Sequence, residues 1–179
     1  MKLSPTARRS DDRDLVAFLG GLCLFLSTIE YLVPKPVPFL RIGIANLPLL
    51  IGLDLLSPGQ LMLVACLKVI GQGLLSGTLT TYVFLFSAAG TFSSALAMLA
   101  VHRLAGPRLS LVGVSVTGAL LSNLAQITLA IVTDLIGQAA WVIAPLFIAA
   151  GTVSAALLGW FAERFAASSR WLASVKGSP

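Results

Sequence analysis

Long runs of apolar residues without a single charge dominate the second half of the chain. The longest run covers residues 69–101, and two more cover residues 109–133 and 135–162. An α-helix needs about 20 mostly apolar residues to cross the roughly 30 Å of hydrocarbon in a bilayer. Each run is therefore long enough for one transmembrane helix, or for two short helices joined by a close turn. The pattern predicts an all-α integral membrane protein.

Prolines, glycines and charges divide the chain into six apolar segments. Three prolines interrupt the chain at 34–38, and Ser57-Pro58-Gly59 and Ser76-Gly77-Thr78 mark two further turns. The second segment is short, and its residues would form about 21 Å of helix, which is less than a full crossing. We expect a compact bundle of six transmembrane helices within residues 15–163, between polar tails at 1–14 and 164–179. The predicted helices cover residues 15–33, 44–57, 60–75, 81–101, 111–135 and 140–161.

Composition supports a membrane location, and the distribution of charge predicts the orientation. Charged residues make up 11% of the chain, against about 25% in soluble domains. Of the 12 lysines and arginines, nine lie in the tails and loops on one side of a six-helix topology and two on the other side. The positive-inside rule then places both termini in the cytoplasm and the protein in the inner (cytoplasmic) membrane. No basic stripe with interleaved aromatics indicates a nucleic-acid partner.

Lys68 is the most unusual residue, because a charge near mid-membrane is expensive and usually faces a cavity or a partner group. Gln72 lies one turn later on the same helix face. Lys68 could bind an anionic or strongly polar ligand, or extend along its own stem to the membrane surface. Glu30 could pair with Lys68, pair with Arg41 across the first loop, or lie in water at the interface. Glu30, Arg41, Lys68 and Gln72 are therefore candidate ligand-binding residues.

Two further pairs of residues suggest contacts between helices or with a ligand. Asn123 and Gln126 are three apart in the fifth predicted helix, so they share a face. Amides in hydrocarbon need hydrogen-bond partners, which could belong to another helix or to a ligand. Ala17 and Gly21 are four apart in the first predicted helix, and small residues at this spacing allow a second helix to approach closely. That second helix could belong to this chain or to a partner subunit.

Residues for catalysis are scarce. His102 is the one histidine, and no Ser/His/Asp set, metal-spaced cluster or phosphate-binding glycine loop occurs. The acidic cluster at 11–14 precedes the first helix and has the setting of a solvated segment beside the membrane. Cys23 and Cys66 lie in apolar segments without the spacing of a metal site. We expect no enzymatic activity in the chain itself, no cofactor and no bound metal.

Several short motifs follow one another in order from Glu30 to Gln126. They are Glu30-Tyr-Leu-Val-Pro, Arg41-Ile-Gly-Ile-Ala-Asn46-Leu-Pro, Lys68-Val-Ile-Gly-Gln-Gly, Ser76-Gly-Thr, Ser87-Ala-Ala-Gly90, and Leu111-Val-Gly-Val-Ser-Val-Thr-Gly118 leading to Asn123-Leu-Ala-Gln126. This series, which spans more than half of the chain, resembles the family known as heptaprenyl diphosphate synthase component I, or the Gx transporter family. One position differs, since the family commonly has histidine directly before the asparagine and this chain has Ser122.

That family is similar to the S components of energy-coupling factor (ECF) transporters, and the similarity implies a fold and a function. S components are small six-helix proteins with cytoplasmic termini that hold a vitamin-like ligand under the first loop. They work with a scaffold subunit and two ATPases. The resemblance implies that Ala17 and Gly21 contact the scaffold. It also implies a ligand cavity bordered by Arg41, Asn46, Lys68, Asn123 and Gln126.

The sequence is compatible with three functions. The first hypothesis is a substrate-binding membrane subunit of an ECF-like importer for a small vitamin-like or otherwise polar molecule. The second is a non-catalytic membrane accessory subunit (component I) of a heptaprenyl or other prenyl diphosphate synthase. The third is a structural subunit of a membrane redox or assembly complex. Membrane lipids surround the protein in all three.

Overall fold

The computed structural model describes residues 5–32, 43–106, 109–134 and 139–172. Within these ranges the ordered elements are all helical, and no strand occurs. They are α1 (Pro5–Leu32), the 3₁₀ turn η1 (Ile44–Asn46), α2 (Leu47–Gly52), α3 (Pro58–Leu75), α4 (Tyr82–Ala105), α5 (Leu111–Val132) and α6 (Ala139–Ser168). The predicted all-α class is confirmed.

Four of these helices are long and apolar enough to cross a membrane: α3, α4, α5, and α6 from Trp141 onward. The count of six transmembrane helices is not confirmed. The second predicted helix, over 44–57, is replaced by η1 and by α2, whose six residues form about 9 Å of helix. In α1, the uncharged stretch between Asp14 and Glu30 corresponds to about 22 Å of helix. Both segments are shorter than the hydrocarbon layer.

Local sequence explains where two of the long helices begin. Ser57 and Gln60 form a capping box at the start of α3, in which each side chain accepts a hydrogen bond from the backbone N–H of the other. At the start of α5, the hydroxyl of Ser110 accepts a hydrogen bond from the N–H of Gly113 at 3.2 Å. Such caps satisfy backbone donors that a helix cannot satisfy itself, and each contributes about 1 kcal/mol.

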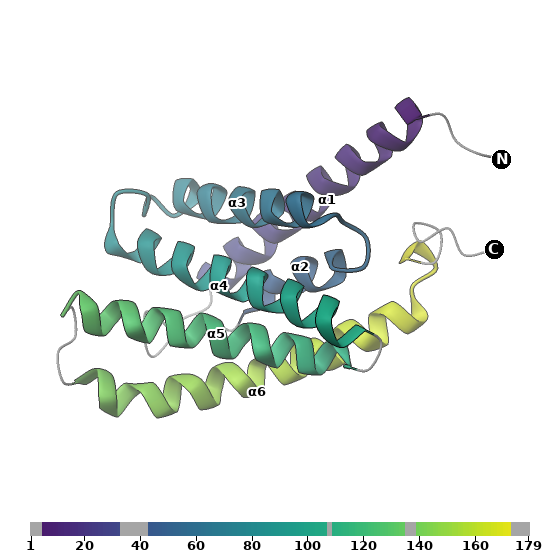
Figure 1. Cartoon of the computed structure of the whole chain (residues 1–179). Helices are drawn as coiled ribbons and strands as arrows, with labels where there is room; N and C mark the ends of the chain where they lie inside the picture. The colour runs from purple at the N-terminus through teal and green to yellow at the C-terminus, as the bar shows by residue number, and fades with distance from the viewer. Residues whose placement is uncertain (1–4, 33–42, 107–108, 135–138, 173–179) are drawn as a thin grey trace.

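The helices form a ring around a common interior. α3 packs on α1, α4 on α3, α5 on α4 and α6 on α5, and α2 closes the ring by contacting both α6 and α1 (Figure 1). Residues 48–52 of α2 are all buried, so this short helix lies among the longer ones rather than on their surface. The ring geometry therefore brings α1, the η1–α2 segment and α6 around the same space.

Apolar side chains fill one half of this interior. The core residues come from the middle of α1, from the N-terminal halves of α3 and α5, from α2, and from the C-terminal halves of α4 and α6. These halves of α3, α4, α5 and α6 lie at one end of the bundle (Figure 1). They include Val16, Leu19, Leu49, Leu61, Val64, Ala95, Met98, Val114 and Ala162. At the same end, Nε2 of His102 lies 3.0 Å from Oδ1 of Asp54 and links the end of α4 to the turn after α2.

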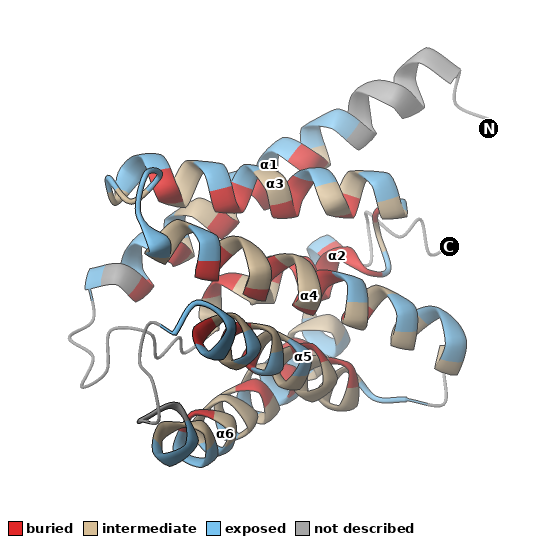
Figure 2. Cartoon of the chain, turned by 60° about the vertical axis from the view of Figure 1, so that its left-hand side comes forward, coloured by how far each residue is buried: buried red, intermediate tan, exposed pale blue. Residues whose placement is uncertain are grey.

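The outer surface of the bundle is largely apolar. Exposed and half-buried residues cover the outward faces of the long helices (Figure 2), and the large apolar ones include Leu74, Leu96, Val142, Leu146, Val153 and Leu157. Soluble monomers rarely expose apolar patches larger than a few hundred Å². Together with the four long apolar helices, this surface is that of a membrane protein, as the sequence predicted.

Candidate ligand-binding site

A polar cavity lies inside the ring, in the half that the apolar core leaves open. All the long helices and the η1–α2 segment contribute to its wall. Its polar lining consists of Glu30, Asn46, Lys68, Gln72, Thr91, Ser94, Ser115, Ser122, Asn123 and Gln126. Polar residues on membrane-embedded helices usually face the interior of a bundle and mark functional sites. The cavity is therefore the candidate site.

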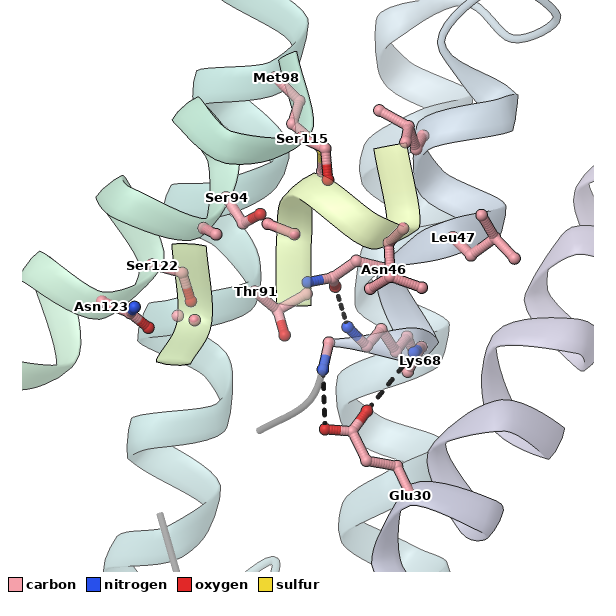
Figure 3. Close-up of a pocket in the computed structure, with 18 of the residues that line it drawn as sticks. Glu30, Asn46, Leu47, Lys68, Thr91, Ser94, Met98, Ser115, Ser122 and Asn123 are labelled. Carbon is pink, nitrogen blue, oxygen red and sulfur yellow. Dashed lines mark hydrogen bonds between the residues drawn. The ribbon is translucent and has the colours of Figure 1, made fainter. Parts of the chain in front are cut away.

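Glu30 fixes the chain segment that forms one side of the cavity. Its side chain is buried, and its two carboxylate oxygens accept hydrogen bonds from the backbone N–H groups of Gly43, at 3.0 Å, and Ala45, at 3.4 Å (Figure 3). Gly43 has a φ of 82°, in the left-handed region that favours glycine. Hydrogen bonds from N–H groups to a carboxylate are among the stronger ones. Glu30 thus holds η1 against α1, and of the alternatives for this residue, the one with the carboxylate in interfacial water is wrong.

Lys68 holds the same segment from α3. Its side chain is only 4% exposed, and Nζ donates a hydrogen bond to Oδ1 of Asn46, the last residue of η1 (Figure 3). The alternative in which Lys68 extends to the membrane surface is wrong, because the ammonium group ends inside the cavity. Gln72, one turn later on α3, also lines the cavity, as their shared face predicted.

Asn123 connects α5 to α6 at the cavity wall. Its Nδ2 donates a hydrogen bond to the backbone carbonyl of Phe147 at 3.2 Å. A β-carbon at Gly151 would overlap the Asn123 amide, so glycine at this position makes the space for it. The sequence left open whether this amide contacts a helix or a ligand. The structure shows the helix contact, and the same side chain also lines the cavity.

Gln126 bonds within its own helix. Its Nε2 donates hydrogen bonds to the hydroxyl of Ser122, at 3.0 Å, and to the carbonyl of Ser122, at 3.3 Å. A β-carbon at Gly90 on α4 would overlap both side chains. Ser122 stands where the resemblance places a histidine, and its hydroxyl orients the Gln126 amide along the cavity wall.

The cavity is small. Its volume is about 60 Å³, whereas pockets for drug-sized ligands measure about 300–1,000 Å³. By this measure of volume, a cavity needs about 10–15 Å³ to hold one water molecule. The arrangement seen here thus has room for one polar group of a few non-hydrogen atoms, and a larger ligand requires the wall to move.

The structure brings together most of the predicted binding residues. Glu30, Asn46, Lys68, Gln72, Asn123 and Gln126 all line the cavity, although they are distributed over almost 100 positions of sequence. Arg41 lies outside the described residues. Ala17 and Gly21, predicted to contact a partner, lie on the exposed side of α1, and a β-carbon at Gly21 would meet no atom within 4 Å.

Sequence reasoning missed the hydroxyl groups of the cavity wall. Thr91 and Ser94 of α4 and Ser115 of α5 line the cavity, and the first two are buried. Ser87, Thr91, Ser94 and Met98 are spaced by three and four residues and lie on one buried face of α4. The spacing of the three hydroxyl residues within the uncharged run at 69–101 is the signal that could have identified them.

Metal-ligating side chains do not gather in this site. Across the described ranges of the chain, no group of three or more histidine, cysteine, aspartate or glutamate residues lies close enough to hold a metal ion. The cavity wall offers amides, hydroxyls, one ammonium and one carboxylate group. These groups suit recognition of a polar molecule by hydrogen bonds.

Comparison with known families gives a clear result. The family model described as heptaprenyl diphosphate synthase component I matches residues 19–165, which cover nearly all of the helical bundle. The chain belongs to this family. The match confirms the resemblance seen in the sequence motifs, and the family description favours the second functional hypothesis over the first. No curated protein and no solved structure matches the chain, so the similarity to ECF S components stays a prediction.

Proposed function

We propose that the chain is a non-catalytic membrane subunit that binds a small polar molecule in the Lys68 cavity and acts through a partner protein. The observation that carries this proposal is the pair of buried ionisable side chains, Glu30 and Lys68, in one polar cavity of an otherwise apolar bundle. Burying such groups is expensive, and apolar residues of similar volume often stabilise a fold equally well or better. Ionisable side chains buried in a membrane protein usually have a function, and binding a polar molecule is the function proposed for this pair.

A prenyl diphosphate synthase is the partner that the family assignment supports best. In this role the chain is the membrane component I, and the catalytic residues belong to another subunit. The shortage of metal-ligating clusters in the described ranges is compatible with a partner that supplies the chemistry. The cavity would then bind a polar molecule that the assembly uses or senses.

An ECF-like importer is the second candidate, and two observations favour it. A polar cavity within a helical ring is suited to carrying a small molecule across a membrane. The exposed face of α1 around Ala17 and Gly21 leaves space for a scaffold helix. In this role the scaffold and two ATPases would be the partners, and the cavity would hold the transported molecule.

Orientation in the membrane belongs to the same proposal. The N-terminal end of α1 and the C-terminal end of α6 lie at the same end of the bundle (Figure 1). Exposed arginines belong to the segments at this end, namely Arg13, Arg103, Arg164 and Arg170. The positive-inside rule supports placing this end in the cytoplasm, in an inner (cytoplasmic) membrane.

One experiment separates the two candidates. The full chain is tagged, expressed in the organism it comes from, and extracted in mild detergent. After cross-linking, the proteins bound to it are identified by mass spectrometry. A soluble protein with the aspartate-rich motifs of prenyl transfer supports the synthase. A polytopic scaffold together with two nucleotide-binding ATPases supports the importer. If the chain is recovered without any cross-linked partner protein, and native mass spectrometry shows no bound small molecule, the proposal as a whole is contradicted.

A further inference from the structure

The hydroxyl groups on the long helices are of two kinds, those that bond to their own helix backbone and those that do not. Thr28, Thr117 and Thr152 each donate to the carbonyl four residues earlier, at 2.8–2.9 Å, which is the usual arrangement in apolar helices. The hydroxyls of Ser27 in α1 and of Ser115 in the cavity wall make no such bond. Thr91 and Ser94 make none either. They are 4% and 1% exposed, they line the cavity, and they have no hydrogen-bond partner among the described residues.

Two amide oxygens add acceptors to this wall. Asn123 and Gln126 use their NH₂ groups for Phe147 and Ser122, and their side-chain oxygens accept no hydrogen bond from the described residues. Buried polar groups of native proteins are nearly always hydrogen-bonded. The α4–α5 side of the cavity therefore offers both donors and acceptors to a molecule inside it, while Lys68 and Glu30 lie on the α1–α3 side (Figure 3).

The charges of the described cavity wall cancel. Lys68 is its one cation and Glu30 its one carboxylate, and both are engaged by groups of the protein. Against this described wall, a ligand with a net charge would add an uncompensated charge, which is strongly unfavourable in a buried site. An uncharged ligand has no such cost.

We propose that the cavity recognises an uncharged carboxamide or urea-like group, and that Thr91 and Ser94 are ligand-binding residues. The ligand carbonyl accepts from the Thr91 and Ser94 hydroxyls, and its NH₂ group donates to the oxygens of Asn123 and Gln126. A carboxamide has only three non-hydrogen atoms, which suits a cavity of about 60 Å³. This inference rests on the proposed role of the cavity as a binding site, and it names the chemical class of the ligand.

Acetamide and acetate form a matched pair of probes, because they have nearly the same shape and differ in charge. Full-length protein in lipid nanodiscs is titrated with each probe, and binding is followed by saturation-transfer NMR. We expect saturable binding of acetamide, and binding of acetate at least about tenfold weaker. Acetate binding as tightly as acetamide, or no saturable binding of acetamide, would overturn the proposal.

The variant Thr91→Val/Ser94→Ala tests the two residues. It should weaken acetamide binding by about tenfold or more, since each hydroxyl lost removes a hydrogen bond to the probe. Its unfolding midpoint should not fall, because these hydroxyls have no described partner in the protein; if the double variant does not fold, Ser94→Ala alone is compared. Thr117→Val, a hydroxyl bonded within α5 away from the cavity, is the control and should leave acetamide binding unchanged. Unchanged binding in the double variant, or an equal loss in the control, would overturn the assignment.

The partner experiment and the probe experiment fail independently. Identification of a synthase or an importer partner does not depend on acetamide binding, and acetamide binding requires no partner. Partner capture without acetamide binding overturns the ligand class alone. If the chain binds acetamide but no partner protein is captured with it, the ligand class is supported and the proposed role as a subunit is contradicted.

Discussion

Asn123 on α5 lies so close to Gly151 on α6 that a β-carbon at position 151 would overlap its amide nitrogen. The amide therefore reaches the carbonyl of Phe147, at 3.2 Å, across a gap that only glycine leaves. Further along the same pair of helices, a β-carbon at Gly159 would overlap the backbone of Val112. Gly151 and Gly159 thus serve packing inside the chain, and Gly151 also positions a cavity residue.

Gly151→Ala should destabilise the fold by about 1–3 kcal/mol, because the new methyl group displaces Asn123 and its hydrogen bond to Phe147. The free energy of unfolding in detergent measures this change. Gly59→Ala is the control, since a β-carbon there meets no atom within 4 Å, and it should be neutral or slightly stabilising. Equal stability of both variants would contradict the packing seen at Gly151.

Lys68→Met and Glu30→Gln should be strongly coupled. Lys68→Met keeps the length of the side chain but removes the one cation of the described cavity wall and leaves the Glu30 carboxylate buried, so we expect a loss of about 3–5 kcal/mol. Adding Glu30→Gln removes the uncompensated charge and should recover much of that loss. Unfolding of the two single variants and of the double variant gives the coupling free energy. Strictly additive effects would show that the two residues do not share one electrostatic environment.

Gly21→Leu should separate partner binding from folding. The position faces outward on α1 with open space around it, so the larger side chain should leave the unfolding midpoint unchanged. If this face meets a partner helix, co-purification of the partner should be lost. The adjacent Gly20 is buried, and a β-carbon there would lie 3.2 Å from Cδ1 of Leu67. Gly20→Leu should therefore lower stability. Partner binding that survives Gly21→Leu would exclude this face as the interface.

Cysteine labelling should show that the two ends of α4 lie on opposite sides of the membrane. Thr80, just before α4, and Leu104, near its end, are both exposed, and the 24 residues of α4 form about 36 Å of helix. In a background without Cys23 and Cys66, a membrane-impermeant maleimide should label Thr80→Cys in intact cells. It should label Leu104→Cys only after permeabilisation. The reverse pattern would invert the proposed orientation, and labelling of both from outside would contradict a spanning α4.

Uncharged apolar runs and turn residues predicted several helix boundaries, but not the outer ends of the first and last helices. Helix α1 begins at Pro5, within the predicted polar tail 1–14, and α6 ends at Ser168 rather than at 161, because polar residues can continue a helix beyond the apolar run. The ends of α3 at Leu75, of α4 at Tyr82 and of α5 at Leu111 match the predicted spans within one residue. These boundaries are local, because prolines, glycines and capping serines act within a few residues of themselves. The second span was predicted too long, because its hydrophobicity alone does not reveal that α2 stops at Gly52 inside the bundle.

Residue chemistry in the sequence was sufficient to select Lys68, Glu30, Asn123 and Gln126 as unusual, because polar groups in hydrocarbon need partners. Which partners they have was decided by the tertiary structure. Lys68 bonds to Asn46, and Glu30 to the N–H groups of Gly43 and Ala45, across distances in sequence that no periodicity encodes.

The sequence by itself determined the membrane class, the family and the positions of the long helices, since these depend on hydrophobicity, local turns and motifs along the chain. Only the tertiary structure decided that these helices close into a ring with α2, and that Thr91 and Ser94 turn toward its interior. A serine or threonine in an apolar helix can always bond to its own backbone. Whether it does so or faces a cavity depends on the neighbouring helices, and their approach is set by packing across the whole bundle.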